Sequence, residues 1–327
     1  MPLTRLNGRC TAAVVVRYTI DMFARAAIAA CLVLACAAAH ADLRLRSAHA
    51  LVVDDETGEV LLRKNGETPV PIASLTKLMT AMVVLDAGQD ASEPLRIDTA
   101  DLDHLKHTRA GLPVGAVLPR GELLELSLIA SDNHATAALA RHYPGGGVAF
   151  RAAMRAKIAE LGLVHTDIEE PTGLSPNNRS TAEDMVRVLR AASTYAEIAR
   201  ITSKDRHAVM LDKRRTWRVR NTNRFVGAQG WNISLSKTGF TNEAGRCLTM
   251  RLQEAGRTVM VVLMGAVGSQ HRAVDALNIR RWLAGQTRPA AVAPPARTPY
   301  VPSKAPEAPL DASEQALLQA VAEHGEE

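Results

Sequence analysis

Three short motifs, widely spaced along the 327 residues, constrain this chain more than any other feature. In chain order they are Ser74–Lys77 (SLTK), Ser131–Asn133 (SDN) and Lys237–Gly239 (KTG). A serine-x-x-lysine pattern alone is weak evidence, but a given tripeptide is expected roughly once in several thousand positions at ordinary residue frequencies. The occurrence of all three in this order argues against coincidence and indicates a serine acyl-transfer site.

The first motif supplies a nucleophile and a base. Ser74 and Lys77 are three residues apart, and residues at this spacing are neighbours on a helix face. A serine hydroxyl is a poor nucleophile until a base removes its proton, and a lysine can be that base when burial and nearby cations lower its pKa. A helix beginning at Ser74 would also aim backbone N–H groups at the reacting carbonyl. Taken alone, the motif favours Ser74 as an ordinary helix N-cap.

The second motif falls where two helical patterns are interrupted. Ser, Asp and Asn are ordinary turn and cap residues, so this tripeptide by itself would indicate a helix–helix break. In combination with the first motif, we expect Ser131 to relay a proton towards the leaving amine and the Asn133 amide to bind the substrate backbone. Asp132 would point away and have a structural role.

The third motif follows an apolar strand pattern, which predicts that it ends a strand at the edge of the site. Lys237 would add positive charge that favours neutral Lys77, and Thr238 would donate a hydrogen bond to a substrate carboxylate. Gly239 has no Cβ, so substrate backbone could approach it closely. The backbone N–H groups of Ser74 and Phe240 are the candidate oxyanion hole.

Apolar periodicity predicts an α+β fold. A hairpin is expected over 50–65, and the pattern is helical from Ser74 to about Ser203, where the first helix is apolar nearly all round and therefore buried. Strand patterns then return, and a final helix closes the domain. The simplest architecture is one mainly antiparallel sheet with its first and last strands together, a helical insertion between them and helices packed on it. The expected later elements are helices 122–130, 133–143, 149–161 and 181–198, strands 233–238, 246–252 and 258–264, and helix 269–283.

The two ends of the chain differ from this domain, which we place at 42–286. Residues 1–41 read as a secretory signal peptide, with an apolar run 26–39 after Arg25 and an A-x-A cleavage site before Asp42. Translation starting at Met22 and lipoprotein processing at Cys36 are the alternatives. Residues 287–327 form a Pro/Ala-rich linker and a short acidic tail, either partner-binding or without a role. This organisation predicts export to the periplasm.

Composition excludes several other functions. Three of the four cysteines lie in the signal segment, and the remaining Cys247 is expected to be a small buried residue in a strand. No aromatic-rich basic patch suggests a nucleic-acid partner. His104 and His107 have helical spacing but lack the pattern of a metal site. The turn 169–174 does not fit the loop that carries the hydrolytic glutamate of class A β-lactamases.

With these residues identified, the chain resembles the low-molecular-mass penicillin-binding proteins, in which the three motifs form the active site. It is most similar to the D-alanyl-D-alanine endopeptidase branch, that of penicillin-binding protein 7, although Asp132 stands where that branch has a glutamate. The likeness covers about 50–283 and includes segments 73–82, 142–146, 170–175, 220–223 and 231–242.

The resemblance implies a β-lactamase/transpeptidase-like fold, a covalent acyl-enzyme on Ser74 and acylation of Ser74 by β-lactam antibiotics. It implies no metal, no organic cofactor, no nucleic acid and no stable membrane anchor after signal cleavage. The partners would be peptide stems of peptidoglycan, and the reaction would be hydrolysis of D-Ala–meso-diaminopimelate cross-links. A D-alanyl-D-alanine carboxypeptidase is the alternative, because terminal D-Ala presents the same local shape. A β-lactamase or a non-catalytic penicillin-binding sensor fits the residues less well.

Overall fold

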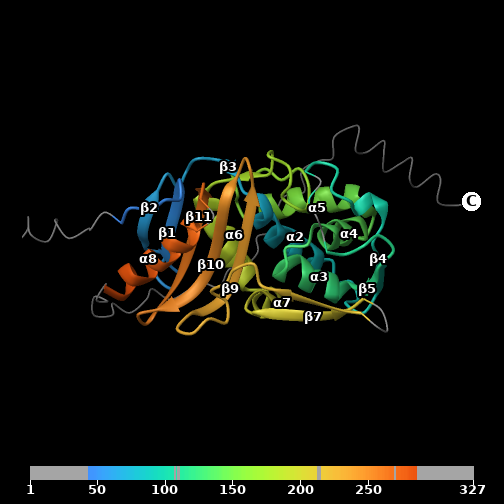
Figure 1. Cartoon of the computed structure of the whole chain (residues 1–327). Coiled ribbons are helices and arrows are strands. Elements are labelled where there is room, and N and C mark those ends of the chain that lie inside the picture. The colour runs from blue at the N-terminus through green and yellow to red at the C-terminus, as the bar shows by residue number, and fades with distance from the viewer. Residues whose placement is uncertain (1–42, 107, 109–110, 212–214, 269, 286–327) are drawn as a thin grey trace, which may run out of the picture. The chain divides into compact units, whose positions relative to one another are not determined.

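A five-stranded antiparallel sheet is the core of the structure, a computed structural model that describes residues 43–106, 108, 111–211, 215–268 and 270–285. The strand order is β2-β1-β11-β10-β9 (Figure 1). β1 pairs with β11 from His49 opposite Met264 to Asp54 opposite Val259, which confirms that the first and last strands are adjacent. The strands are β1 (His49–Asp54), β2 (Val60–Lys64), β9 (Asn232–Thr241), β10 (Gly245–Glu254) and β11 (Arg257–Ala266).

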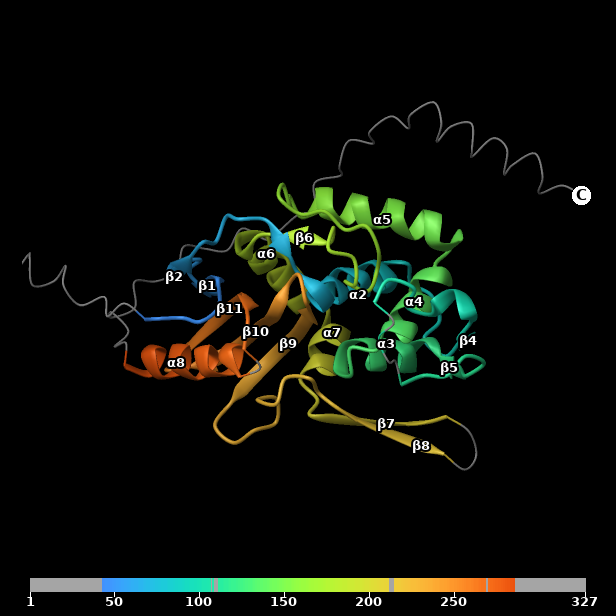
Figure 2. The same cartoon turned by 45° about the horizontal axis from the view of Figure 1, so that its top comes forward.

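Helices cover both faces of this sheet. α6 (Ala182–Ser193) lies on one face and α8 (His271–Gly285) on the other (Figures 1 and 2). Both faces of β11 are therefore buried, which explains why its sequence is a continuous apolar run without alternation. Asp275 on α8 is fully buried and accepts hydrogen bonds from the backbone N–H groups of Arg46 and Ser47, at 2.9 and 2.6 Å. These bonds attach α8 to the segment that precedes β1.

The remaining helices pack around α2 (Thr76–Asp86) beside the sheet (Figure 2). Every residue of α2 from Thr76 to Val84 is buried, which confirms the expectation of a helix covered on all sides. Between α3 and α4 the chain breaks at Ser131, as the sequence predicted. The helices around α2 are α3 (Arg120–Ile129), α4 (Asn133–Arg141), α5 (Gly146–Glu160) and α7 (Ala196–Thr202).

The structure corrects the single helix expected over 181–198. Two helices, α6 and α7, occupy this stretch, and Thr194 and Tyr195 are the cap residues between them. The Thr194 hydroxyl donates to the carbonyl of Ala191 at 2.8 Å, and the Tyr195 hydroxyl donates to Asp86 at 2.8 Å. These side-chain contacts compensate for the break, and apolar periodicity alone does not show them.

Several short strand pairs were not predicted. β7 (Arg206–Met210) and β8 (Thr216–Arg220) form a hairpin of two five-residue strands, both of which carry charged residues. β3 (Val70–Pro71) pairs with β6 (Arg179–Ser180), and β4 (Pro94–Arg96) pairs with β5 (Val117–Pro119). Such short segments fall below the length at which hydrophobic patterning identifies a strand.

Cys247 lies fully buried in β10, as expected for a small residue in a strand. Burial raises the pKa of its thiol to about 11. The predicted signal segment 1–41 and the predicted tail 287–327 fall outside the described residues. Within the described part of the chain, no helix has the length and apolar character needed to cross a membrane.

Candidate active site

Ser74 lies in a single 3-10 turn, η1 (Ala73–Leu75), which leads directly into α2 (Figure 2). Ser74 does not cap a helix, as the first motif taken alone would favour, because neither η1 nor α2 has a side-chain cap and the N-cap residue of α2 is Leu75. The residue before the serine, Ala73, has φ +47°, a conformation that alanine rarely adopts. The turn is thus held by the surrounding structure, and the serine hydroxyl is not used for capping.

Two glycines allow the rest of the protein to approach this turn. Gly173 has φ +87°, and a Cβ on it would lie 2.0 Å from the carbonyl oxygen of Ala73. On Gly239 a Cβ would lie 3.0 Å from both the Ser74 nitrogen and the Ile72 oxygen. The close approach at Gly239 is therefore to the chain's own backbone, where the sequence had suggested substrate. The turn is packed between the loop that contains Gly173 and strand β9.

Lys77 lies one helical turn beyond the serine and is fully buried. Its Nζ donates to Ser74 Oγ at 3.0 Å, to Asn133 Oδ1 at 2.8 Å and to the carbonyl oxygen of Thr172 at 2.6 Å. An ammonium group has three N–H donors, so these acceptors use all of its hydrogen-bonding capacity. The structure thus brings Ser74, Lys77 and Asn133 together, as predicted.

The pKa of Lys77 is lowered from 10.5 to about 8. Burial is the main cause because it removes water from the charged form. The carboxylates of Glu170, Asp132 and Asp103 act in the opposite direction and keep the pKa from falling further. A lysine with this pKa is neutral in a useful fraction of molecules near neutral pH, which a general base requires.

The loop 169–178 is a part of the site whose role sequence reasoning missed. Its shape depends on Glu170, whose carboxylate accepts hydrogen bonds from the backbone N–H groups of Thr172, Gly173 and Leu174 at 2.6–2.7 Å. This arrangement directs the Thr172 carbonyl at Lys77. The sequence indicates only a turn over 169–174, and the similarity of 170–175 to the family is the one signal for its role.

A second buried lysine lies beside the first. Lys237 is 1 % exposed, and its Nζ donates to Ser131 Oγ at 2.9 Å and to the Thr238 carbonyl oxygen at 3.1 Å. Ser131 itself has φ +61°, which turns its side chain out of the helix–helix break. Burial, then the charge of Lys77, then that of Arg272 lower the pKa of Lys237.

The third motif lies within a strand, which corrects its expected position at a strand end. β9 continues past Gly239 to Thr241, and Lys237, Thr238 and Gly239 pair with residues of β10. Pairing on β10 fixes the direction of these side chains, because successive residues of a strand point to opposite faces.

Asp132 and Asn133 follow the break after α3, and their side chains contact different segments of the chain. Asp132 is 5 % exposed, and its carboxylate accepts from the N–H of Ala135, as the N-cap of α4, at 2.8 Å and from the N–H of Gly111 at 2.9 Å. This geometry agrees with the structural role expected for Asp132. The Asn133 amide donates to Thr108 Oγ1 at 2.9 Å, so Thr108 borders the site.

The last residues of β9 include the remaining candidates. The Thr238 hydroxyl donates to Thr222 Oγ1 at 2.7 Å, and Arg272 from α8 donates to the Gly239 carbonyl at 3.1 Å. Phe240 is half-exposed and lies beneath the Arg246 guanidinium, 4.5 Å from the ring centre. From the sequence, Thr222 appears only within the segment 220–223 that resembles the family, and Arg272 lies in none of the motifs or quoted segments. Among the described residues, no group of three or more His, Cys, Asp or Glu side chains is arranged to hold a metal ion.

Solved structures with this architecture include a DD-transpeptidase and a penicillin-binding protein homologue. The Streptomyces K15 DD-transpeptidase superposes with a TM-score of 0.68 at 24% identity, over 73% of this chain and 97% of that one. A penicillin-binding protein homologue from Mycobacterium tuberculosis gives 0.65 at 25% identity, over 75% and 94%. The fold is therefore that of the DD-transpeptidases and penicillin-binding proteins.

Residues 35–268 match the D-alanyl-D-alanine carboxypeptidase family (Peptidase_S11), and the chain belongs to this family of serine peptidases. A D-alanyl-D-alanine endopeptidase of Pseudomonas aeruginosa is 43% identical over 240 residues, which are 73% of this chain and 77% of that protein. The D-alanyl-D-alanine endopeptidase of Escherichia coli is 40% identical over the same shares. A D-alanyl-D-alanine carboxypeptidase of Bacillus subtilis is 30% identical over 71% of this chain and 60% of that protein.

Proposed function

We propose that the protein is a periplasmic serine D,D-endopeptidase that hydrolyses D-Ala–meso-diaminopimelate cross-links of peptidoglycan. The observation that carries this proposal is the arrangement of three acceptors around Lys77 Nζ beside Ser74. When Lys77 loses one proton, its two remaining N–H groups stay with Asn133 and Thr172. Its lone pair then faces the Ser74 hydroxyl, as base catalysis requires.

Acylation follows from this arrangement. Lys77 takes the hydroxyl proton while Ser74 Oγ attacks the D-Ala carbonyl, and the N–H groups of Ser74 and Phe240 stabilise the oxyanion. Ser131 gives a proton to the departing amine. It recovers a proton from Lys237, from which it accepts a hydrogen bond. The C–N bond breaks, and the peptide remains as an ester on Ser74. Water then attacks this ester. One proton of the water returns to the Ser74 oxygen and the other goes to the lysine left neutral by acylation, so the new carboxylate is released and the serine is restored.

Substrate binding uses the groups around β9. The Asn133 amide and the strand backbone at Gly239 would hold the acyl peptide. Thr238 and the adjacent Arg272 would face the carboxylate next to the scissile bond, because both present donors at the same edge of β9. β-Lactams carry a carboxylate in the equivalent place and would acylate the same serine.

The endopeptidase is favoured over the carboxypeptidase because the two relatives at 40% identity or more carry that name. The carboxypeptidase differs only in the leaving group. The same proposal includes cleavage of the signal peptide 1–41, a peptidase domain at 42–286, a separate linker and tail at 287–327 and no stable membrane anchor after cleavage.

Mass spectrometry of muropeptides after incubation with the mature protein tests the function. Conversion of cross-linked dimers to monomers, absent in Ser74→Ala, is the expected result. Release of terminal D-Ala from pentapeptides without loss of dimers would replace the endopeptidase by the carboxypeptidase. Penicillin labelling that persists in Ser74→Ala would refute the assignment of the nucleophile. Rapid turnover of penicillin would favour a β-lactamase, and a stable adduct without any peptide cleavage would favour a sensor.

A further inference from the structure

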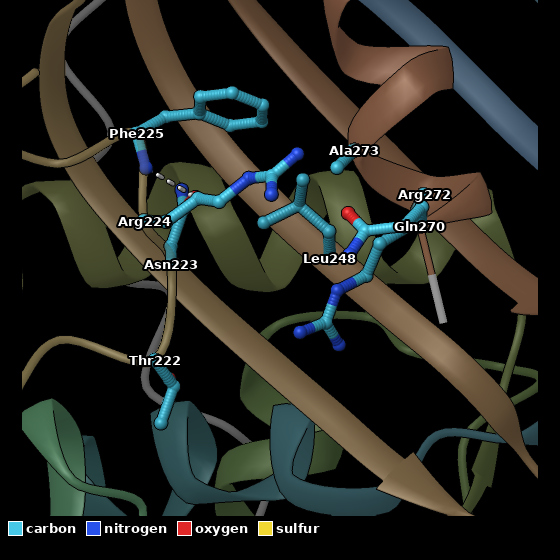
Figure 3. Close-up of a pocket in the computed structure, with 8 residues that line it drawn as sticks. All are labelled: Thr222, Asn223, Arg224, Phe225, Leu248, Gln270, Arg272 and Ala273. Atoms are coloured by element: carbon cyan, nitrogen blue, oxygen red, sulfur yellow. Dashed lines mark hydrogen bonds between the residues drawn. The ribbon is translucent and has the colours of Figure 1, made fainter.

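A pocket of about 150 Å³ lies next to the proposed site, between the loop 222–225 and the first turn of α8 (Figure 3). Leu248 on β10 is at its base. The guanidinium groups of Arg224 and Arg272 extend into the same space from opposite sides (Figure 3). No step of the reaction described above uses Arg224.

The position of the pocket associates it with the leaving side of the substrate. Its edge is Thr222, whose hydroxyl accepts a hydrogen bond from Thr238 at 2.7 Å. The Thr222 N–H donates to the carbonyl of Ile129 at 3.2 Å, two residues before Ser131, so the pocket lies at the Ser131 end of the site. Because Ser131 gives its proton to the departing amine, the group that departs lies at this end of the site. A leaving group that continues past Thr238 would therefore extend towards the pocket.

The pocket is strongly cationic. Within the part of the chain that the structure describes, no carboxylate contacts Arg224 or Arg272; Arg272 donates to backbone carbonyls of Gly239 and Cys247. Burial first, and then the positive charges of Arg246 and Arg224, lower the pKa of Arg272. Because these arginines repel one another and have no carboxylate among them, the pocket should favour binding of an anionic group of the substrate.

The loop that carries Arg224 is held on both sides. Asn223 is 4 % exposed; its amide donates to Ser236 Oγ at 2.8 Å, and its Oδ1 accepts from the Phe225 N–H at 3.1 Å. The Phe225 ring stacks on Trp231, with ring centres 4.2 Å apart. Arg224 is therefore presented from a fixed backbone, which lowers the entropic cost of binding an anion.

We propose that Arg224 binds a second carboxylate of the leaving stem peptide and thereby favours cross-linked substrates over terminal D-Ala; this inference rests on the proposed function. A departing D-Ala has one carboxylate, and Thr238 and Arg272 face that group. A departing stem peptide has the same carboxylate next to the scissile bond and further carboxylates along its chain. Only the second kind of leaving group extends far enough to use Arg224. The residue thus supplies a selectivity that none of the three motifs encodes.

The test compares two substrates in matched variants. The measured quantity is the ratio of kcat/KM for cleavage of a cross-linked dimer to kcat/KM for D-Ala release from a monomeric pentapeptide. We expect Arg224→Gln to lower this ratio by roughly ten-fold or more, because the substitution removes a charged hydrogen bond that only the dimer makes. Arg224→Lys should recover part of this ratio, because it keeps the charge and loses the planar fork. Arg281→Gln removes an exposed arginine from α8, outside the pocket, and should leave the ratio unchanged. Equal losses on both substrates, or no loss on the dimer, would overturn the proposal.

A binding measurement separates this inference from the proposed function. The free stem tetrapeptide, the leaving product, should slow acylation by a fluorescent penicillin competitively, and Arg224→Gln should raise its inhibition constant by a similar factor. If the unmodified protein cleaves no dimers but the tetrapeptide still competes through Arg224, the endopeptidase assignment fails and the carboxylate subsite stands. If the inhibition constant is the same in both proteins, the subsite is refuted whatever the peptidase activity. Labelling of the variant by penicillin shows that it is folded.

Discussion

The two halves of the site are each built around a buried lysine, yet the neighbourhoods of these lysines differ. Lys77 has three hydrogen-bond acceptors, and the charges that act on it most strongly are the carboxylates of Glu170, Asp132 and Asp103. Lys237 has two acceptors, a hydroxyl and a carbonyl, and the charges acting on it are the cations Lys77 and Arg272. Burial lowers the pKa of both, but only Lys77 has carboxylates that counteract it.

Burial alone therefore does not determine which of the two lysines acts as the catalytic base. At Lys77 the opposing effects leave a pKa of about 8, at which the group can both take and return a proton near neutral pH. At Lys237 the cations add to the effect of burial, so an arriving carboxylate would supply the charge that this centre lacks. We therefore expect Lys77 to act on the nucleophile, and Lys237 to act on Ser131 and on the anionic substrate.

The largest effect is expected from Lys77→Met. Methionine fills a similar volume but can neither accept a proton nor donate to the three acceptors, so acylation by penicillin should fall by about a thousand-fold or more. Stopped-flow labelling measures this rate. Lys64→Met is the matched control, since Lys64 also donates to backbone carbonyls but lies on β2 away from the site. An acylation rate within ten-fold of the unmodified protein would remove Lys77 from its role as base.

A smaller loss is expected from Lys237→Met, about a hundred-fold in kcat/KM for cross-linked muropeptides, because Lys77 remains. The variant also tests whether Lys237 favours neutral Lys77. Removal of a neighbouring cation stabilises protonated Lys77, so its pKa should rise and the inflection of the acylation rate should move to higher pH. A pH–rate profile of penicillin acylation measures this inflection. An unmoved inflection would mean that the two lysines titrate independently.

Most of the fold could be predicted because its elements are long and apolar. The hairpin β1–β2, the last three strands and the adjacency of β1 and β11 all follow from hydrophobic runs and their order. The break between α6 and α7 could not be predicted, since it depends on contacts of Tyr195 with residues distant in sequence. The strands of the hairpin β7–β8 have five residues each, and apolar segments this short do not identify a strand reliably.

In the site, the motifs identified the residues that meet at the two lysines, but their surroundings remained hidden. Thr172 contacts Lys77 through its backbone carbonyl, and every residue type has such a carbonyl. Gly239 was attributed to substrate approach, whereas its neighbour is the backbone of Ser74. Arg224 and Arg272 come from segments separated in sequence and belong to no motif. These features arise from tertiary packing, so a single sequence does not reveal them.

The glycines on either side of the Ser74 turn should differ in their tolerance of a side chain. Gly173→Ala combines a positive φ with a contact of 2.0 Å to backbone, so it should cost roughly 3 kcal/mol or more, about 6–12 °C in Tm for a domain of this size. Gly239→Ala meets contacts of 3.0 Å and should lower acylation with a smaller loss of Tm. Thermal unfolding and penicillin labelling distinguish the two. The reverse order of Tm losses would contradict the packing described here.

The smallest effect concerns the carboxylates that act on Lys77. In the unmodified protein the acylation rate should rise with pH and level off above about 8, because only neutral Lys77 accepts the serine proton. Asp103→Asn removes a negative charge that stabilises protonated Lys77, so the pKa falls and the inflection should move to lower pH. Asp90→Asn is the control, since Asp90 is an exposed turn residue whose carboxylate accepts hydrogen bonds from Ser92 and is not among the charges acting on Lys77. A shift to higher pH in Asp103→Asn would show that a different effect outweighs the electrostatic change, namely weaker hydrogen bonds from the backbone N–H groups of Leu105, Lys106 and Thr108 to this side chain. A shift to lower pH would establish that carboxylates raise the pKa of Lys77 and so oppose the effect of burial. This opposition is the feature that distinguishes Lys77 from Lys237.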